Sequence, residues 1–305
     1  MIIKTQAIVL SVRPFSETSQ VVSWLSVDCG KISTIVKGAQ RPRNFFLGRY
    51  DLFYTCELLF YLRLFQGLHI VKECFPLKSR PALRSRWRGT ACASYFTGLT
   101  ARVTPLHAPQ HDVYELLEAA LDFFSEKDAE RRAAVAGRAA SGRPQMPQTE
   151  PGATAPAATQ KTFEDKSVHA LEMGLYWFEM KLLELIGFSP VLQACLQCRR
   201  PLPPSGAKTP ESKNGKNYVE FSAARGGVLC EACRPRCGKD SIRLAADTLA
   251  LLRFWQSSRK TNAIRNTAYH ARQIGEIGGL LGDFLQHHLE TENTGRKIAL
   301  SILRQ

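Results

Sequence analysis

The first 75 residues alternate apolar and polar side chains with a period of two, which is the pattern of half-buried β-strands. Turn-forming residues such as Pro14, Gly30 and Gly38 divide this region into short segments rich in Val, Ile, Tyr and Phe. The predicted strands cover residues 4–12, 20–26, 31–38, 49–63 and 67–74. Five strands of this length predict a small β-barrel.

After Pro81 the apolar positions recur every three or four residues, which indicates amphipathic helices. The predicted helices cover residues 91–103, 112–124, 168–188, 244–255 and 274–290. Gly187 and Pro190 supply a C-terminal cap and a stop for the third of them. Residues 128–166 are rich in Ala, Pro, Gly, Thr and Gln. Because they bury little apolar surface, we expect a disordered loop there.

Four cysteines form two CxxC pairs, Cys195 with Cys198 and Cys230 with Cys233. Two such turns can direct four thiolates at one point, which is the tetrahedral set that structural Zn²⁺ prefers. Between the pairs, residues 218–230 have the pattern of a strand, a Gly-Gly turn and a return strand, so a zinc ribbon is the favoured interpretation. An iron–sulfur cluster uses the same ligands and stays open. A thioredoxin-like pair lacks its βαβ setting, and Cys237 is interpreted as a bystander rather than a spare ligand.

The other cysteines, Cys29, Cys56, Cys74 and Cys92, are scattered through apolar segments, as free buried thiols are in cytosolic proteins. The N-terminal segment lacks a small-residue cleavage site, so a signal peptide is rejected. No apolar run approaches the roughly 20 residues that span a bilayer. These observations favour a cytoplasmic protein.

The charge narrows the class of partner. The chain has 41 Lys and Arg against 27 Asp and Glu, a formal net charge of +14. This excess favours a polyanionic partner, nucleic acid before a membrane surface, over a merely soluble basic protein. Arg41 and Arg43, which flank Pro42 in a predicted exposed loop, are the preferred phosphate contacts. The full set of candidate contacts is Arg13, Lys31, Lys37, Arg41, Arg43 and Arg49.

Aromatic side chains in the same region are candidate stacking partners for unpaired bases. Phe15 and Tyr50 are candidates, together with Phe45 and Phe46, for which packing where the barrel closes is an equally supported interpretation. The adjacent His287 and His288 point to different helix faces and are interpreted as structural.

Motifs for catalysis are absent from the sequence. It contains no GxxxxGK[ST] loop and no GxSxG elbow. Gly275, Gly278 and Gly279 lie inside a helical pattern, which indicates close helix packing. A zinc nuclease or deaminase needs an open ligand position or an H-x-E motif, and a four-thiolate site offers neither. We therefore predict a protein that is not an enzyme, with an RNA-binding accessory factor in transcription or translation as the alternative to a DNA-binding protein.

Residues 7–26 read AIVLSVRPFSETSQVVSWLS, and residues 30–44 combine a glycine, a strand and a basic loop. LIGFSP is followed in order by the first CxxC, FS, GG and the second CxxC, and LLGDFLQHHL and KIALSIL lie near the end of the chain. Together these stretches resemble the bacterial RecO family of recombination mediators, in its opening, its glycine–strand–basic-loop segment, its zinc module and its last helix. The likeness excludes residues 128–166 and 201–217. The loop GAQRPRN carries fewer cations than is usual in the family, which predicts weaker DNA binding there.

The resemblance implies an N-terminal OB-fold five-stranded barrel and a C-terminal all-α domain that carries a small zinc-ribbon insert. The expected domains are an OB-fold DNA-binding domain over residues 1–79 and a helical domain in two parts, residues 80–189 and 240–305, with the zinc-binding insert over residues 190–239 between them. It also implies binding of single- and double-stranded DNA, annealing without ATP, and work with RecR and single-stranded DNA-binding protein in loading RecA. The acidic tail of single-stranded DNA-binding protein would dock on the helical domain, where Arg102 and Arg253 are candidates. A nucleoid-associated protein without a membrane partner is expected.

Overall fold

In the computed structural model, seven stretches of the chain are described, and they form two compact units. Contacts separate Met1–Leu171 with Ala299–Gln305 from Glu172–Ile298. Within the described ranges, every helix is too short or too polar to span a bilayer. The described residues are 1–63, 67–141, 158–202, 218–236, 241–258, 269–289 and 293–305, with side chains described outside 127–168, 235 and 236.

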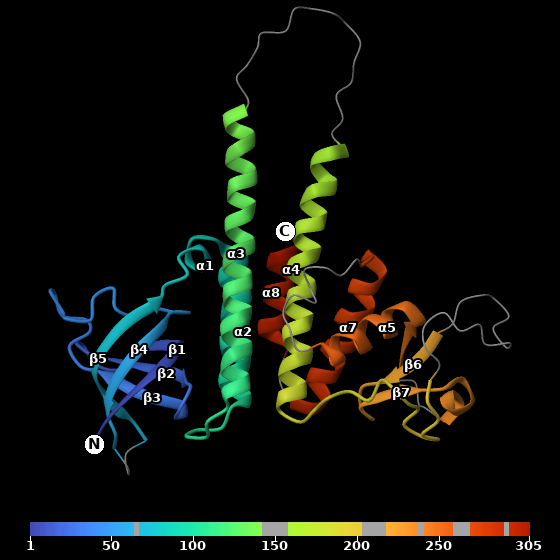
Figure 1. Cartoon of the computed structure of the whole chain (residues 1–305), viewed down its shortest axis with the longest axis horizontal. Coiled ribbons are helices and arrows are strands. Elements are labelled where there is room, and N and C mark those ends of the chain that lie inside the picture. The colour runs from blue at the N-terminus through green and yellow to red at the C-terminus, as the bar shows by residue number, and fades with distance from the viewer. Residues whose placement is uncertain (64–66, 142–157, 203–217, 237–240, 259–268, 290–292) are drawn as a thin grey trace, which may run out of the picture. The chain divides into compact units, whose positions relative to one another are not determined.

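The first unit begins with a five-stranded barrel (Figure 1). Its strands are β1 (Ile2–Pro14), β2 (Gln20–Ser26), β3 (Gly30–Val36), β4 (Thr55–Tyr61) and β5 (His69–Lys78). The strands pair in the order β1-β2-β3-β5-β4, and β4 pairs back with β1. All pairings are antiparallel except β3 with β5. This order is that of the OB-fold, and it confirms the predicted fold class for this part of the chain.

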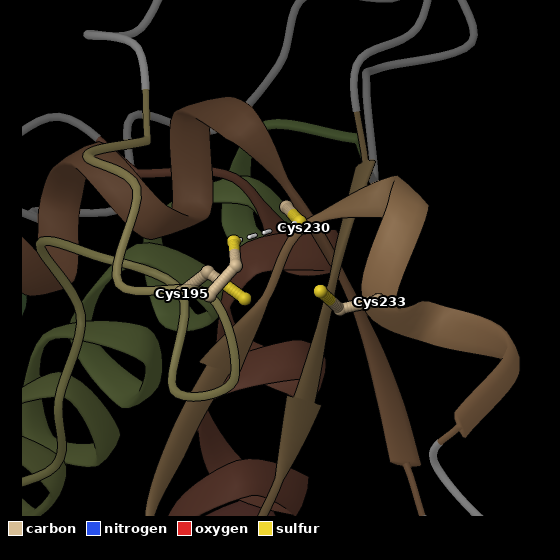
Figure 2. Close-up of side chains that lie close together, drawn as sticks. Cys195, Cys230 and Cys233 are labelled. Atoms are coloured by element: carbon tan, nitrogen blue, oxygen red, sulfur yellow. Dashed lines mark hydrogen bonds between the residues drawn. The ribbon is translucent and has the colours of Figure 1, made fainter.

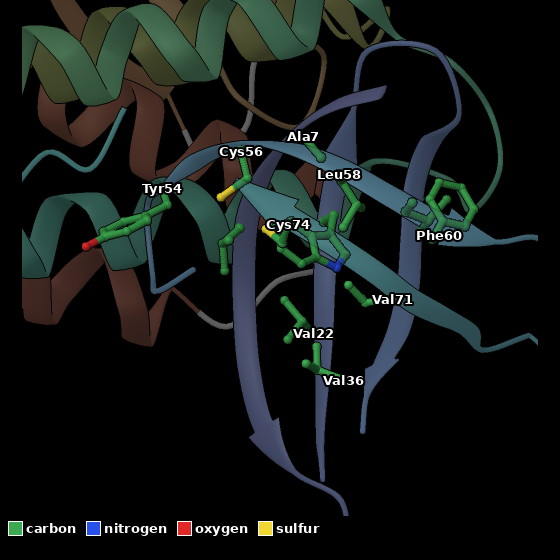
Figure 3. Packing of buried hydrophobic residues seen from close by; sticks show 12 residues of the cluster. Ala7, Val22, Val36, Tyr54, Cys56, Leu58, Phe60, Val71 and Cys74 are labelled. Carbon is green, nitrogen blue, oxygen red and sulfur yellow. The ribbon is translucent and has the colours of Figure 1, made fainter. Parts of the chain in front are cut away.

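The barrel core comes from the side chains that alternate inward along these strands (Figure 3). β3 shows the alternation plainly, because its buried and half-buried residues follow each other from Gly30 to Val36. Trp24 is fully buried, and its Nε1 donates a hydrogen bond of 2.8 Å to Thr34 Oγ1, so its polar atom is satisfied inside the barrel. The period-two pattern therefore identified the residues that fill the core.

The predicted strand over residues 49–63 is wrong in its first half. Only Thr55–Tyr61 forms a strand, and residues 49–54 form turns. Phe53 has a positive φ of 69°, and the amide of Tyr54 donates to the carbonyl of Asp51 at 3.2 Å. Phe53 and Tyr54 are both buried. The apolar pattern correctly indicated that these side chains are buried. A turn that packs on the core can bury them as well as a strand can.

Three helices follow the barrel in the first unit: α1 (Ala82–Ser85), α2 (Trp87–Val103) and α3 (His111–Ser141). The buried Arg80 joins this helical part to the barrel. Its Nε donates to Asp122 of α3 at 2.6 Å, and its Nη1 donates to the carbonyl of Phe53 at 2.7 Å and to Thr55 Oγ1 at 3.0 Å. A buried guanidinium is stable only with such partners, so Arg80 fixes α3 against the barrel.

The predicted loop over residues 128–166 is partly helical. α3 continues to Ser141, and the next helix, α4 (Ala158–Leu185), begins inside the predicted loop. The physical reason is helix propensity, because Ala, Glu, Lys and Arg extend a helix without a buried face. Residues 142–157 lie outside the described part of the chain, so the loop prediction stays a prediction for them.

The second unit combines helices with a small antiparallel sheet. Strands β6 (Tyr218–Ser222), β7 (Gly227–Leu229) and β8 (Ser241–Ala245) are arranged in the order β7-β6-β8. A short 3₁₀ helix, η1 (Glu231–Arg236), follows β7. Its helices are the main part of α4, α5 (Ala246–Ser257), α7 (Ala271–Leu289) and the start of α8 (Thr294–Arg304).

The sequence pattern found most of these elements but missed β8 and treated the last two helices as one. α7 ends at Leu289, and α8 starts a new helix at Thr294. The predicted close helix packing is confirmed at Gly278, where an added Cβ atom would lie 2.5 Å from Tyr176 Oη. The same prediction is wrong for Gly275 and Gly279, because no atom of the neighbouring elements lies within 4 Å of an added Cβ at either position.

Candidate metal centre and nucleic-acid interface

Two tight turns of the second unit position the four cysteines. In the first, the amide of Arg199 donates to the carbonyl of Cys195 at 2.8 Å, and Arg199 has a φ of 58°. In the second, the amide of Cys233 donates to the carbonyl of Cys230 at 3.0 Å, at the start of η1. Each CxxC spacing therefore closes a turn that places both of its thiols on one side.

The β6–β7 hairpin brings the two turns together. The amide of Leu196 donates to the carbonyl of Val228 in β7 at 2.9 Å, so the first turn lies along the hairpin. Gly226 has a φ of 82° in the hairpin turn, a conformation in which other residues are strained. At Gly227 a Cβ would lie 2.4 Å from the carbonyl oxygen of Val191. The predicted strand, Gly-Gly turn and return strand are confirmed.

The sulfur atoms of Cys195, Cys198, Cys230 and Cys233 all lie within 4.8 Å of one another, and Figure 2 shows three of these side chains converging. The sulfurs of Cys198 and Cys230 are 3.7 Å apart. Zn–S bonds of about 2.3 Å in a tetrahedron place sulfurs about 3.8 Å apart. The four thiols therefore fit a zinc ion, and they can hold a metal without an open coordination position. Cys237 lies outside the described residues.

The thiols influence one another electrostatically. Burial favours the neutral thiol of Cys195, but backbone groups of Cys198, Cys230 and Gln197 stabilise its thiolate and lower its pKa to about 6. Hydrogen bonding with Cys230 raises the pKa of Cys233 to about 12. Four thiolates this close repel each other unless a cation lies between them. Thiolate donors of this kind suit a soft metal ion.

Four of the six candidate nucleic-acid residues lie in one segment of the barrel, residues 37–50 between β3 and β4. Lys37, Arg41 and Arg43 are all exposed there, and Arg43 has a positive φ of 60°. The amide of Gln40 donates to the carbonyl of Thr18 at 3.1 Å, which ties this segment to the β1–β2 turn. From residue 29 to residue 50 the chain has five basic and no acidic residues. The segment is therefore a concentrated positive surface.

Arg49 is placed differently from the other cations. Its guanidinium carbon lies 3.9 Å from the centroid of the Phe45 ring and 5.0 Å from that of Phe75 on β5. Phe45 is 56% exposed and Phe75 is 39% exposed. Phe46, by contrast, packs against the barrel core. Phe45 and Phe75 therefore present exposed rings beside a cation.

Phe75 is a candidate that the sequence reasoning missed. The predicted strand over residues 67–74 ends one residue before it, whereas β5 continues to Lys78, and only the fold brings Phe75 beside Arg49. The sequence carried no local signal for this pairing, because the two residues lie in different segments of the barrel.

The remaining two candidates lie apart from the loop. Arg13 is exposed at the end of β1, next to the exposed Phe15 in the β1–β2 turn. Lys31 is half-buried, and its Nζ donates a hydrogen bond to the carbonyl of Ala101 in α2. Burial lowers the pKa of Lys31. Lys31 therefore contributes to packing between β3 and α2, whatever else it contacts.

Two residues suggested for protein docking lie in different units and different settings. Arg102 is exposed near the end of α2. The Nε of Arg253 donates to the carbonyl of Leu192 at 3.0 Å, and burial lowers the pKa of Arg253.

His288 Nε2 lies 2.9 Å from the carbonyl oxygen of Ala223, and the centroid of its ring lies 4.2 Å from that of Phe284. His288 is therefore structural, as the sequence suggested.

Fold and site together define an OB-fold protein that carries a basic, aromatic barrel surface and a separate four-cysteine metal module. Two family models match the chain, "Recombination protein O N terminal" over residues 1–80 and "Recombination protein O C terminal" over residues 162–297. The chain belongs to the RecO family.

Curated relatives extend the match over almost the whole chain. "DNA repair protein RecO" of Syntrophus aciditrophicus (strain SB) is 23% identical, with 99% of this chain and 96% of the relative covered. The protein of the same name from Anaeromyxobacter sp. (strain K) is 27% identical, over 97% of this chain and 93% of the relative. The protein of the same name from Rhodopirellula baltica is 28% identical, over 75% of this chain and 66% of the relative. The resemblance found in the sequence is confirmed.

Proposed function

We propose that this protein binds DNA in recombinational repair and anneals complementary single strands without ATP. The observation that carries the proposal is the basic segment 37–50 on an OB-fold barrel, in a chain whose family and relatives are named for recombination and DNA repair. Arg41, Arg43 and Lys37 are its primary phosphate contacts, with Arg13 and Arg49 beside them.

The physical basis of annealing is charge neutralisation. Two single strands repel each other, and Lys and Arg side chains that contact phosphates release counterions and lower this repulsion. Contacts to phosphates and ring faces leave the base edges free to pair. Phe45 and Phe75, with Arg49 across their rings, offer such ring faces. No bond is made or broken, so the proposed role needs no catalytic residue.

Zinc is proposed as the resident metal of the four cysteines, with a structural role. The bound ion would neutralise the four sulfurs and hold the two turns together.

The proposed domain order is the barrel, a helical domain and the cysteine module as its insert. We propose further that the protein acts in the cytoplasm at the nucleoid, with RecR and single-stranded DNA-binding protein, and so promotes the loading of RecA. Docking of the partner's acidic tail on the helical domain belongs to the same proposal.

The test is annealing of two complementary labelled oligonucleotides without ATP, over a series of salt concentrations. Fast annealing that falls steeply with salt is expected for the native protein. Arg41→Ala/Arg43→Ala should slow annealing and flatten the salt dependence. The matched control is Arg200→Ala/Arg234→Ala, which removes two exposed arginines from the cysteine module instead.

Two outcomes would count against the proposal. A native protein that is folded and metal-loaded but does not anneal DNA would remove the annealing role. A clear preference for RNA over single-stranded DNA would favour the alternative, an RNA-binding accessory factor. If the two double variants behave alike, the DNA does not use the barrel loop.

A further inference from the structure

Trp87 is exposed to solvent, whereas the other tryptophans of the chain are buried. The four tryptophans are Trp24, Trp87, Trp177 and Trp255, and the other three are exposed by 0%, 3% and 0% respectively, whereas Trp87 is 53% exposed. An exposed indole offers a large apolar and aromatic face that a binding partner can cover. We propose that Trp87, with Arg86 and Arg88, forms a second contact for single-stranded nucleic acid. This inference rests on the proposed function and extends it beyond the barrel loop.

The local backbone holds the Trp87 indole outward. α1 ends at Ser85, and Arg86 is extended, with φ −138° and ψ 127°, before α2 begins at Trp87. Thr90 Oγ1 lies 2.6 Å from the carbonyl oxygen of Leu83 and 2.8 Å from that of Arg86, so its single hydroxyl hydrogen has an acceptor on each side of this break. Leu83 is fully buried and anchors α1. The indole therefore stands on a fixed backbone, which reduces the entropy lost on binding.

The charge around Trp87 suits phosphate. Residues 74–111 include six basic and no acidic residues. Lys78 and Arg80 face the acidic Glu118 and Asp122 of α3, and Arg84 faces Asp51. Within the described ranges no acidic side chain forms an ion pair with Arg86. The guanidinium carbon of Arg88 lies 5.7 Å from the Trp87 ring centroid. An indole with neighbouring guanidinium groups can stack on a base while the cations contact the adjacent phosphates.

Arg84 connects this contact with the barrel loop. It pairs with Asp51, directly after the basic segment, and its guanidinium carbon lies 4.6 Å from the ring centroid of Tyr54. Arg84 precedes Trp87 by three residues. The basic segment 37–50 and the Trp87 contact are therefore neighbouring parts of the same unit. A strand that follows phosphate contacts from one reaches the other, which favours nucleic acid over an acidic protein as the occupant.

Stacking on Trp87 also distinguishes unpaired from paired strands. A base inside a duplex has both faces covered by its neighbours, so only an unpaired base can stack on the indole. Pairing with a complementary strand would remove this contact while the phosphate contacts persist. Trp87 would thus hold a single strand during annealing and weaken its hold once the duplex has formed.

Intrinsic tryptophan fluorescence tests this directly, because three of the four tryptophans are shielded in the interior. The native protein is titrated with oligothymidylate and, separately, with a hairpin duplex of equal charge. We expect oligothymidylate to quench the emission and to protect it from acrylamide, and the duplex to do neither. Trp87→Phe should lose the quenching but keep an affinity near that of the native protein.

Trp87→Ala should weaken oligothymidylate binding by about 5- to 150-fold, the range seen when one stacking side chain is removed, and change duplex binding less than twofold. Tyr218→Ala is the matched control. Tyr218 is 40% exposed, with the Arg243 guanidinium carbon 5.6 Å from its ring centroid, but it lies in the cysteine-containing unit. It should leave both affinities unchanged. Circular dichroism and metal content confirm that each variant is folded.

The outcomes separate this inference from the proposed function. If the native protein binds neither DNA, the proposed function fails and the inference fails with it. If it binds but Trp87→Ala keeps full oligothymidylate affinity, only the inference is overturned. Equal losses for single strand and duplex would overturn stacking. Unchanged DNA binding with lost binding of purified RecR would reassign Trp87 to a protein interface.

Discussion

The barrel and the cysteine module reach a defined structure by different means. The barrel core contains twelve buried residues, among them Trp24, Phe60 and Tyr54. The cysteine module has a cluster of three, Cys195, Leu229 and Cys233, and two of these are themselves candidate metal ligands. We therefore expect apolar burial to supply most of the stability of the first region, and a metal bound by the thiols to supply most of that of the second. Stability should therefore respond to metal in one region and to cavities in the other.

The largest expected effect is loss of the metal site. Cys195→Ser removes one thiolate of four, and structural zinc sites contribute about 10–16 kcal/mol of apparent binding free energy. We expect loss of bound zinc and fast hydrogen exchange at the amides of β6 and β7, with β1–β5 still protected. Metal analysis and hydrogen exchange measure this. Cys29→Ser, outside the cluster, is the control. Full protection of the hairpin without metal would contradict the proposed role.

A core truncation in the barrel should give the converse result. Phe60 is fully buried, and its ring stacks on that of His69 at 5.1 Å. Phe60→Ala should lower the free energy of unfolding by about 3–5 kcal/mol and leave the zinc content unchanged. Denaturant titration measures it, with the exposed Phe15→Ala as the control. A loss below about 1 kcal/mol would show that the site collapses to fill the cavity.

Gly30 offers a test of backbone fit rather than core volume. It has a φ of 67°, and an added Cβ would lie 2.1 Å from the carbonyl oxygen of Ala108. Gly30→Ala should cost about 2–4 kcal/mol, from the left-handed backbone and the overlap together. Gly48→Ala is a matched control, because its φ is 72° but no atom lies within 4 Å of its added Cβ. Equal losses in the two variants would assign the whole effect to backbone strain.

The smallest effect is expected at the barrel surface. Lys4 Nζ lies 2.8 Å from Glu57 Oε2, and the two side chains are 63% and 32% exposed. Lys4→Ala should change the unfolding free energy by at most about 1 kcal/mol, because solvent and salt screen such a pair. Thermal unfolding at low and high salt measures it. A larger change would mean that Lys4 packs with its alkyl stem rather than pairing by charge.

Much of the fold could be predicted from local pattern alone. The period-two alternation located β1, β2, β3 and β5, and the three-to-four spacing located α2, α4, α5 and α7. The two CxxC spacings identified all four thiols that the structure brings together. These signals are local, because strand and helix periods act over a few residues and a CxxC turn closes on itself.

Other features were decided by the tertiary structure. Residues 49–54 look like a strand because burial and strand formation select the same apolar residues, and only the positive φ of Phe53 shows a turn. Propensity carried α3 to Ser141 where composition suggested a loop. The neighbours of Arg49 and Lys31, Phe75 on β5 and Ala101 in α2, lie far away in the sequence.

By itself the sequence determined most of the element types, the four thiols and the basic character of residues 29–50. The tertiary structure decided which cations are exposed, which pack against rings or carbonyls, and that one tryptophan of four faces solvent. The physical reason is that side-chain chemistry and backbone period are properties of neighbouring residues. Exposure and partnership depend on contacts between segments that the chain brings together only when it folds.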